Sequence, residues 1–101
     1  MTEQQPISKA HKAFLRKVYL AHLIEQQSHN LLSLQQLTLM PRRTLQDTIA
    51  AFGDVGLEVQ FIQQGERHNA GFYKVINWGP INPAWVEANL SLIETALEVK
   101  K

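Results

Sequence analysis

The sequence contains no cysteine, almost no net charge and no long apolar run. Without cysteine, the 101-residue chain forms no disulfide bond, thiolate zinc site or thiol nucleophile, so burial of apolar side chains must hold it together. Ten Lys and Arg against nine Asp and Glu give a formal charge of +1, which by itself predicts no nucleic-acid partner. Apolar runs are only a few residues long, and no basic segment followed by an apolar one opens the chain. We therefore expect a cytoplasmic protein without a membrane span.

The composition is that of one small globular domain. Hydrophobic residues make up 45% and charged residues 19% of the chain, enough for a single core. The sequence has no glycine-rich phosphate loop, no zinc-protease or serine-hydrolase motif and no pair of carboxylates set in an apolar context. It therefore predicts neither an enzyme nor a cofactor.

Helical signals dominate the first half of the chain. After a flexible segment over residues 1–7, Ser8 is expected to cap a helix over residues 8–28, in which Phe14, Val18 and Ala21 share one face.

A second helix is expected over residues 33–39, because Ser33 and Gln36 fit the spacing of a capping box. Pro41 cannot continue that helix but suits the first turn of another, predicted over residues 41–55 and ended by Gly56.

The second half begins with strand signals. Residues 57–63 and 72–78 are rich in alternating, aromatic or β-branched side chains and predict a hairpin over residues 57–78. Asn82 and Pro83 then open a helix predicted over residues 83–99. That helix carries two apolar stripes, more than one core-facing side requires.

This order of elements resembles a winged helix-turn-helix domain. The segment Ser33–Gln46, followed by Ile49, Phe52 and Val55–Leu57, is similar to the family's helix-turn-recognition-helix stretch running into the wing. The resemblance implies a mainly α (α+β) fold with a three-helix core, a β-hairpin wing and an added C-terminal helix, similar to the dimerisation helices of small bacterial regulators. Two departures are Leu39, where the family often has glycine, and Asp47, a carboxylate in the recognition helix.

The resemblance makes double-stranded DNA the expected partner. Arginine side chains match guanine, glutamine matches adenine, and threonine hydroxyl groups donate to phosphate. The expected contacts are Arg42, Arg43, Thr44, Gln46, Asp47 and Thr48 in the recognition helix, with Arg67, His68 and Lys74 in the wing. From Lys9 to Lys74, eight Lys and Arg against five Asp and Glu leave a modest +3.

The second apolar stripe of the C-terminal helix predicts a homodimer. Its expected interface residues are Trp85, Leu92, Ala96 and Val99. The sequence thus favours a dimeric transcriptional regulator.

Two alternatives remain. One is a winged-helix protein-interaction module that does not bind DNA. The other, weaker one is a metal-responsive sensor using His22, Glu25 and His29, which share one side of the first helix; an ordinary surface cluster accounts better for these three residues.

Overall fold

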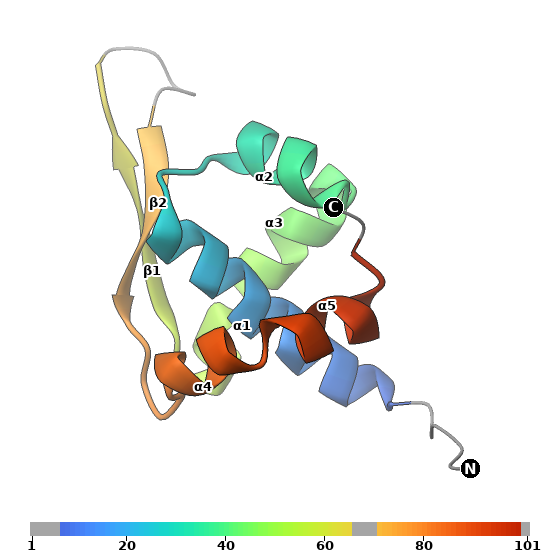
Figure 1. Ribbon diagram of the computed structural model, residues 1–101. Helices are drawn as coiled ribbons and strands as arrows, with labels where there is room; N and C mark the ends of the chain where they lie inside the picture. Colours follow the sequence, from blue (N-terminus) through green and yellow to red (C-terminus); the bar gives the residue numbers. More distant parts are fainter. Residues whose placement is uncertain (1–6, 66–70, 100–101) are drawn as a thin grey trace, which may run out of the picture.

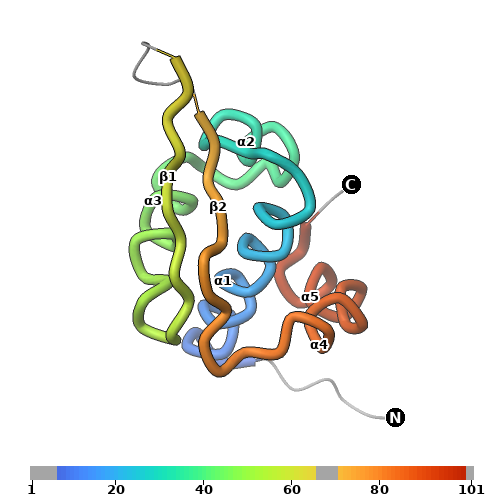
Figure 2. The backbone as a smooth tube through the Cα atoms, turned by 90° about the vertical axis from the view of Figure 1, so that its left-hand side faces the viewer, coloured from blue at the N-terminus to red at the C-terminus, as the bar shows by residue number. Residues whose placement is uncertain are grey.

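The first helix, α1 (Lys9–Gln26), is the centre of the molecule. A computed structural model describes residues 7–65 and 71–99. In it α3 (Arg42–Ala50) lies on one side of α1, and α4 (Pro83–Ala88) and α5 (Leu90–Leu97) lie on the other, with the hairpin packed along α1 (Figures 1 and 2). Within these ranges, no helix is long and apolar enough to cross a membrane.

Two apolar clusters share α1. Its C-terminal half, with Leu20 and Ala21 fully buried, packs against Leu34, Leu45 and Phe52. The other cluster contains Leu15, Val18 and Tyr19 of α1 together with Val86 and Ile93 of the last two helices. Ser8 caps α1 as expected, its hydroxyl oxygen accepting from the His11 amide at 3.0 Å.

The second helix starts earlier than the sequence predicted. α2 runs over Leu31–Thr38, and its N-cap is Asn30 rather than Ser33. The Asn30 side chain accepts from the Ser33 amide at 2.9 Å, while the Ser33 hydroxyl accepts from the Asn30 amide at 2.9 Å. The capping box is therefore Asn30–Ser33. Asparagine is as good a cap as serine, and α2 therefore starts two residues earlier than expected.

The helix expected over residues 41–55 is divided. The α-helical part is α3, and a 3-10 turn, η1 (Phe52–Val55), follows it. Phe52 is buried in the core, and Gly53, a poor helix former, stands in this tightened last turn. Gly56 ends the turn in the left-handed conformation, with φ of 88°, as the sequence predicted.

The hairpin consists of β1 (Glu58–Gln63) and β2 (Gly71–Asn77), paired antiparallel with Val59 opposite Val75 and Phe61 opposite Tyr73. Val59, Tyr73 and Val75 pack against the first apolar cluster, so this face of the hairpin is the inner one. The Tyr73 amide also donates to the His29 carbonyl at 2.8 Å, which ties β2 to the link between α1 and α2.

The C-terminal helix is also divided. The sequence predicted one helix over residues 83–99, but Asn89 separates α4 from α5. The Asn89 side-chain amide donates to the Trp85 carbonyl at 2.8 Å, an interaction through which asparagine competes with the regular helix. Val86 and Ile93 nevertheless both face α1, because the break preserves the buried stripe.

Candidate nucleic-acid interface

The N-terminus of α3 presents backbone donors to solvent. Pro41 is the N-cap and supplies no side-chain hydrogen bond. The first intrahelical hydrogen bond runs from the Leu45 amide to the Pro41 carbonyl at 3.1 Å, so the amides of Arg42, Arg43 and Thr44 precede it. Free amides and the positive end of the helix dipole together favour an anion at this position.

The polar side chains of α3 surround this N-terminus. Arg42, Arg43, Gln46 and Asp47 are all exposed, whereas Leu45 is fully buried on the opposite side. Within the part of the chain that the structure describes, no ion pair joins Arg43 to Asp47. The exposed face of α3 therefore offers two guanidinium groups, one amide and one carboxylate.

One of the two threonines of α3, Thr48, is placed differently from the sequence expectation. Thr48 is only 7% exposed, and its hydroxyl donates to the Thr44 carbonyl at 2.7 Å. Its hydroxyl is thus already used inside the helix, and Thr48 leaves the set of candidate contacts. Thr44 is half-buried and stays in the set.

The inner face of the hairpin lies next to the start of α3. Tyr73 meets Phe61 edge to face, with ring centroids 5.0 Å apart and planes at 70°. Burial raises the pKa of the Tyr73 hydroxyl, and the positive charge of Arg42 acts in the opposite direction. The guanidinium of Arg42 is therefore close enough to the hairpin for its charge to act on Tyr73.

The DNA contacts expected in the hairpin are not all placed near the start of α3. Lys74 is exposed, but it lies opposite Gln60 on the outer face of the hairpin, beside a groove of about 440 Å³ that Ile24, Gln27 and Phe72 also line. The structure thus separates Lys74 from Arg42, because neighbouring residues of a strand point to opposite faces. Arg67 and His68 lie outside the described residues.

One feature of this surface has no counterpart among the predicted contacts. Leu39, in the turn between α2 and α3, has φ of 63° and is 71% exposed, and Leu37 just before it is 42% exposed. The sequence showed leucine in a place often held by glycine, which signals a left-handed residue. It gave no sign that the side chain would stand in solvent.

A profile of the winged helix-turn helix family matches residues 9–97 of the chain. The chain belongs to the winged helix-turn-helix family. In this winged helix, α2 and α3 form the helix-turn-helix and β1 and β2 form the wing.

The chain is also similar to a solved structure, that of a DUF2131 family protein from Shewanella amazonensis SB2B. The two sequences are 58% identical over 93% of this chain and 91% of the other, and the TM-score is 0.88. Among curated proteins, none matches the chain.

The residues predicted to form a dimer interface fall into two groups. Trp85 and Leu92 of the winged helix are 45% and 59% exposed. Ala96 and Val99 are partly buried against the cluster that α1 shares with α5. Trp85 and Leu92 are therefore the more available of the four.

Two of the three residues of the weaker metal-sensor alternative, Glu25 and His29, have other partners. Glu25 accepts a hydrogen bond from the Trp78 indole at 3.0 Å, and the His29 ring makes one with the Ser33 hydroxyl at 2.9 Å. Across residues 7–65 and 71–99, no group of three or more His, Asp or Glu side chains is placed to hold a metal ion.

Proposed function

We propose that this winged helix binds double-stranded DNA through the N-terminal half of α3 and acts as a transcriptional regulator. The observation that carries the proposal is the exposed Arg42, Arg43 and Gln46 around an uncapped helix N-terminus. The buried Leu45 packs this helix against the core, so the polar side chains stand on a rigid support.

Each of these groups has a matching partner on duplex DNA. The arginine forks fit the O6 and N7 atoms of guanine, and the Gln46 amide fits the N6 and N7 atoms of adenine. The free amides at the start of α3 and the Thr44 hydroxyl suit phosphate oxygens. Asp47 repels phosphate but accepts from the cytosine amino group, so it adds selectivity rather than affinity.

The modest positive charge favours a dimer that uses two such sites. We propose a homodimer formed through α4 and α5, with Trp85, Leu92, Ala96 and Val99 as its interface set. A twofold dimer doubles the number of phosphate contacts and presents two recognition helices to one duplex, about 34 Å apart for adjacent turns. The expected setting is the cytoplasm of a bacterium, in line with the bacterial source of the similar structure. No catalytic role is proposed.

The test is a titration of labelled duplex DNA at two salt concentrations. The titration compares two double variants. Arg42→Ala/Arg43→Ala removes the two arginines of α3, and the control, Lys9→Ala/Lys17→Ala, removes the same amount of positive charge from α1. With roughly 1–3 kcal/mol for each good arginine contact, the α3 variant should lose at least about 30-fold in affinity and show a smaller salt slope. The control should stay within a few-fold of wild type. Absence of binding at low salt, or equal losses in both variants, would refute the proposal.

A second function, a protein-interaction module without DNA binding, is favoured by the exposed Leu39 and Leu37 and by the Asp47 carboxylate beside the arginines. An apolar pair next to α3 suits a protein surface better than phosphate. The same titration separates the two functions, because such a module shows no salt-dependent binding of duplex DNA.

A further inference from the structure

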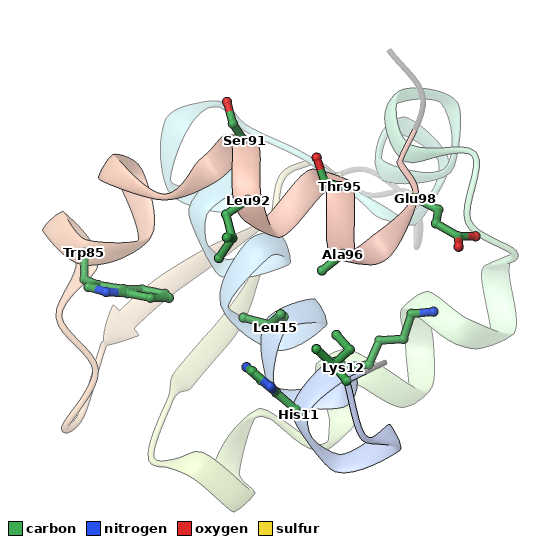
Figure 3. Close-up of a pocket in the computed structure, with 10 residues that line it drawn as sticks. His11, Lys12, Leu15, Trp85, Ser91, Leu92, Thr95, Ala96 and Glu98 are labelled. Carbon is green, nitrogen blue, oxygen red and sulfur yellow. The ribbon is translucent and has the colours of Figure 1, made fainter. Parts of the chain in front are cut away.

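A groove of about 920 Å³ runs between the N-terminal half of α1 and α5, with Trp85 of α4 at one end (Figure 3). Leu15 of α1 forms its floor, and Leu92 and Ala96 point into it from α5. Leu92, Trp85 and Ile7 are exposed apolar residues that line the groove. Covering them removes a substantial apolar area from water, which is the main favourable term in protein association.

The groove carries one charge of each sign at its other end. Lys12 stands on the α1 wall, and Glu98 stands beyond the last turn of α5 (Figure 3). Neither side chain makes an ion pair within residues 7–65 and 71–99. Together they leave this surface without net charge, so two copies of it can meet without repulsion.

The positions of these groups are self-complementary. A twofold axis along the groove places the α1 wall of one chain over the α5 wall of the other. This brings Lys12 to the partner's Glu98 on both sides of the axis, and places Trp85 near the partner's Trp85. An isologous contact requires such a reciprocal match, whereas an unrelated partner has no reason to supply it.

The same arrangement leaves α3 free. α3, α1 and α5 follow one another across the molecule (Figure 2), and packed helices lie 8–10 Å apart in general. Laying α1 over the partner's α5 therefore separates the two α3 helices by about 30 Å, close to the roughly 34 Å of one DNA turn.

We infer that a second copy of this chain occupies the groove, with Leu92 of each chain seated against the other's α1 and Lys12 paired with the partner's Glu98. The inference rests on the homodimer of the proposed function and gives it a geometry. It adds Lys12, Leu15 and Glu98 to the interface, and it leaves out Val99 of the proposed interface set because that residue does not line the groove.

Sedimentation equilibrium over a range of concentrations tests this geometry with charge-reversed variants. Lys12→Glu and Glu98→Lys should each weaken dimerisation at least tenfold, because each places two like-charged pairs at the twofold interface. Mixing these two variants should restore a dimer, since one chain then offers only anions and the other only cations. Lys74→Glu, an equal charge change on the wing, should dimerise like wild type.

The mixture also distinguishes a contact between two copies from a charge effect within one chain. An effect confined to one chain would leave the mixed variants as monomers, and that result would overturn the inference. If both single variants dimerise as wild type while Leu92→Glu does not, the homodimer stands and the assigned pairing is wrong. A wild-type chain that stays monomeric at the highest concentration would refute both the homodimer and its assigned geometry. If the mixed variants form dimers but the protein does not bind duplex DNA in the titration, this inference stands and only the DNA-binding part of the proposed function is refuted.

Discussion

The Leu39→Gly substitution tests the backbone geometry of the turn between α2 and α3. Leu39 ends α2 with φ of 63° and ψ of 14°, and its amide donates to the Gln35 carbonyl at 2.8 Å. A side chain in this left-handed conformation costs roughly 1–2 kcal/mol, because its Cβ crowds the following carbonyl. Glycine has no Cβ and avoids this cost, but it loses about 0.5–1 kcal/mol more backbone entropy on folding.

The matched comparison is Leu39→Ala, which removes the same exposed side chain and keeps the Cβ. The difference between the two variants contains only the strain and the entropy, so the glycine variant should be the more stable by about 0.5–1 kcal/mol. For a domain of this size that corresponds to a melting temperature higher by roughly 3–6 °C.

Urea denaturation followed by circular dichroism measures the two free energies of unfolding. An alanine variant as stable as the glycine variant, or more stable, would refute the assigned left-handed conformation. Duplex binding by the same pair of variants gives a second readout. If Leu39 contacts DNA, both variants lose affinity although the glycine form keeps its stability.

Two further predictions concern buried polar groups. Tyr19→Phe should lower the free energy of unfolding by about 1.5–3 kcal/mol, because the Tyr19 hydroxyl donates to the Glu94 carboxylate at 3.0 Å between α1 and α5. Thermal denaturation measures the loss of stability, and an unchanged melting temperature would contradict the prediction. Burial lowers the pKa of His29 below its ordinary value of 6.5, so the folded state favours the neutral ring. The stability this contributes is complete above pH 6.5 and decreases as the pH falls through 6.5 towards the lower pKa of the folded state. Wild type should therefore lose more stability than His29→Gln between about pH 7 and pH 5 in urea titrations, and parallel losses would contradict the assignment.

Local signals predicted much of the fold. Ser8, Asn82 and Gly56 begin or end their elements as expected, because capping depends on a few neighbouring residues. The family and its mainly α fold followed from the order of these signals. The local signals did not predict the ends of α2 or the breaks at Ala51 and Asn89, because several residues compete for the same cap and packing selects among them.

The candidate DNA-contacting face of α3 was also predicted only in part. Arg42, Arg43 and Gln46 are exposed, as helical periodicity around Leu45 requires. The internal hydrogen bond of Thr48 was not predictable, because a threonine side chain can turn either to solvent or to the preceding turn of its own helix.

The sequence by itself determined the order of the elements, the family and the apolar stripes, because these depend on residues a few positions apart. Only the tertiary structure decided what each surface faces. It placed Lys74 on the outer face of the wing, left Leu39 in solvent, and brought Lys12 and Glu98, from opposite ends of the chain, to the same groove. Such proximity is set by how α1 packs against α4 and α5 through Val18, Val86 and Ile93, and no local pattern encodes it.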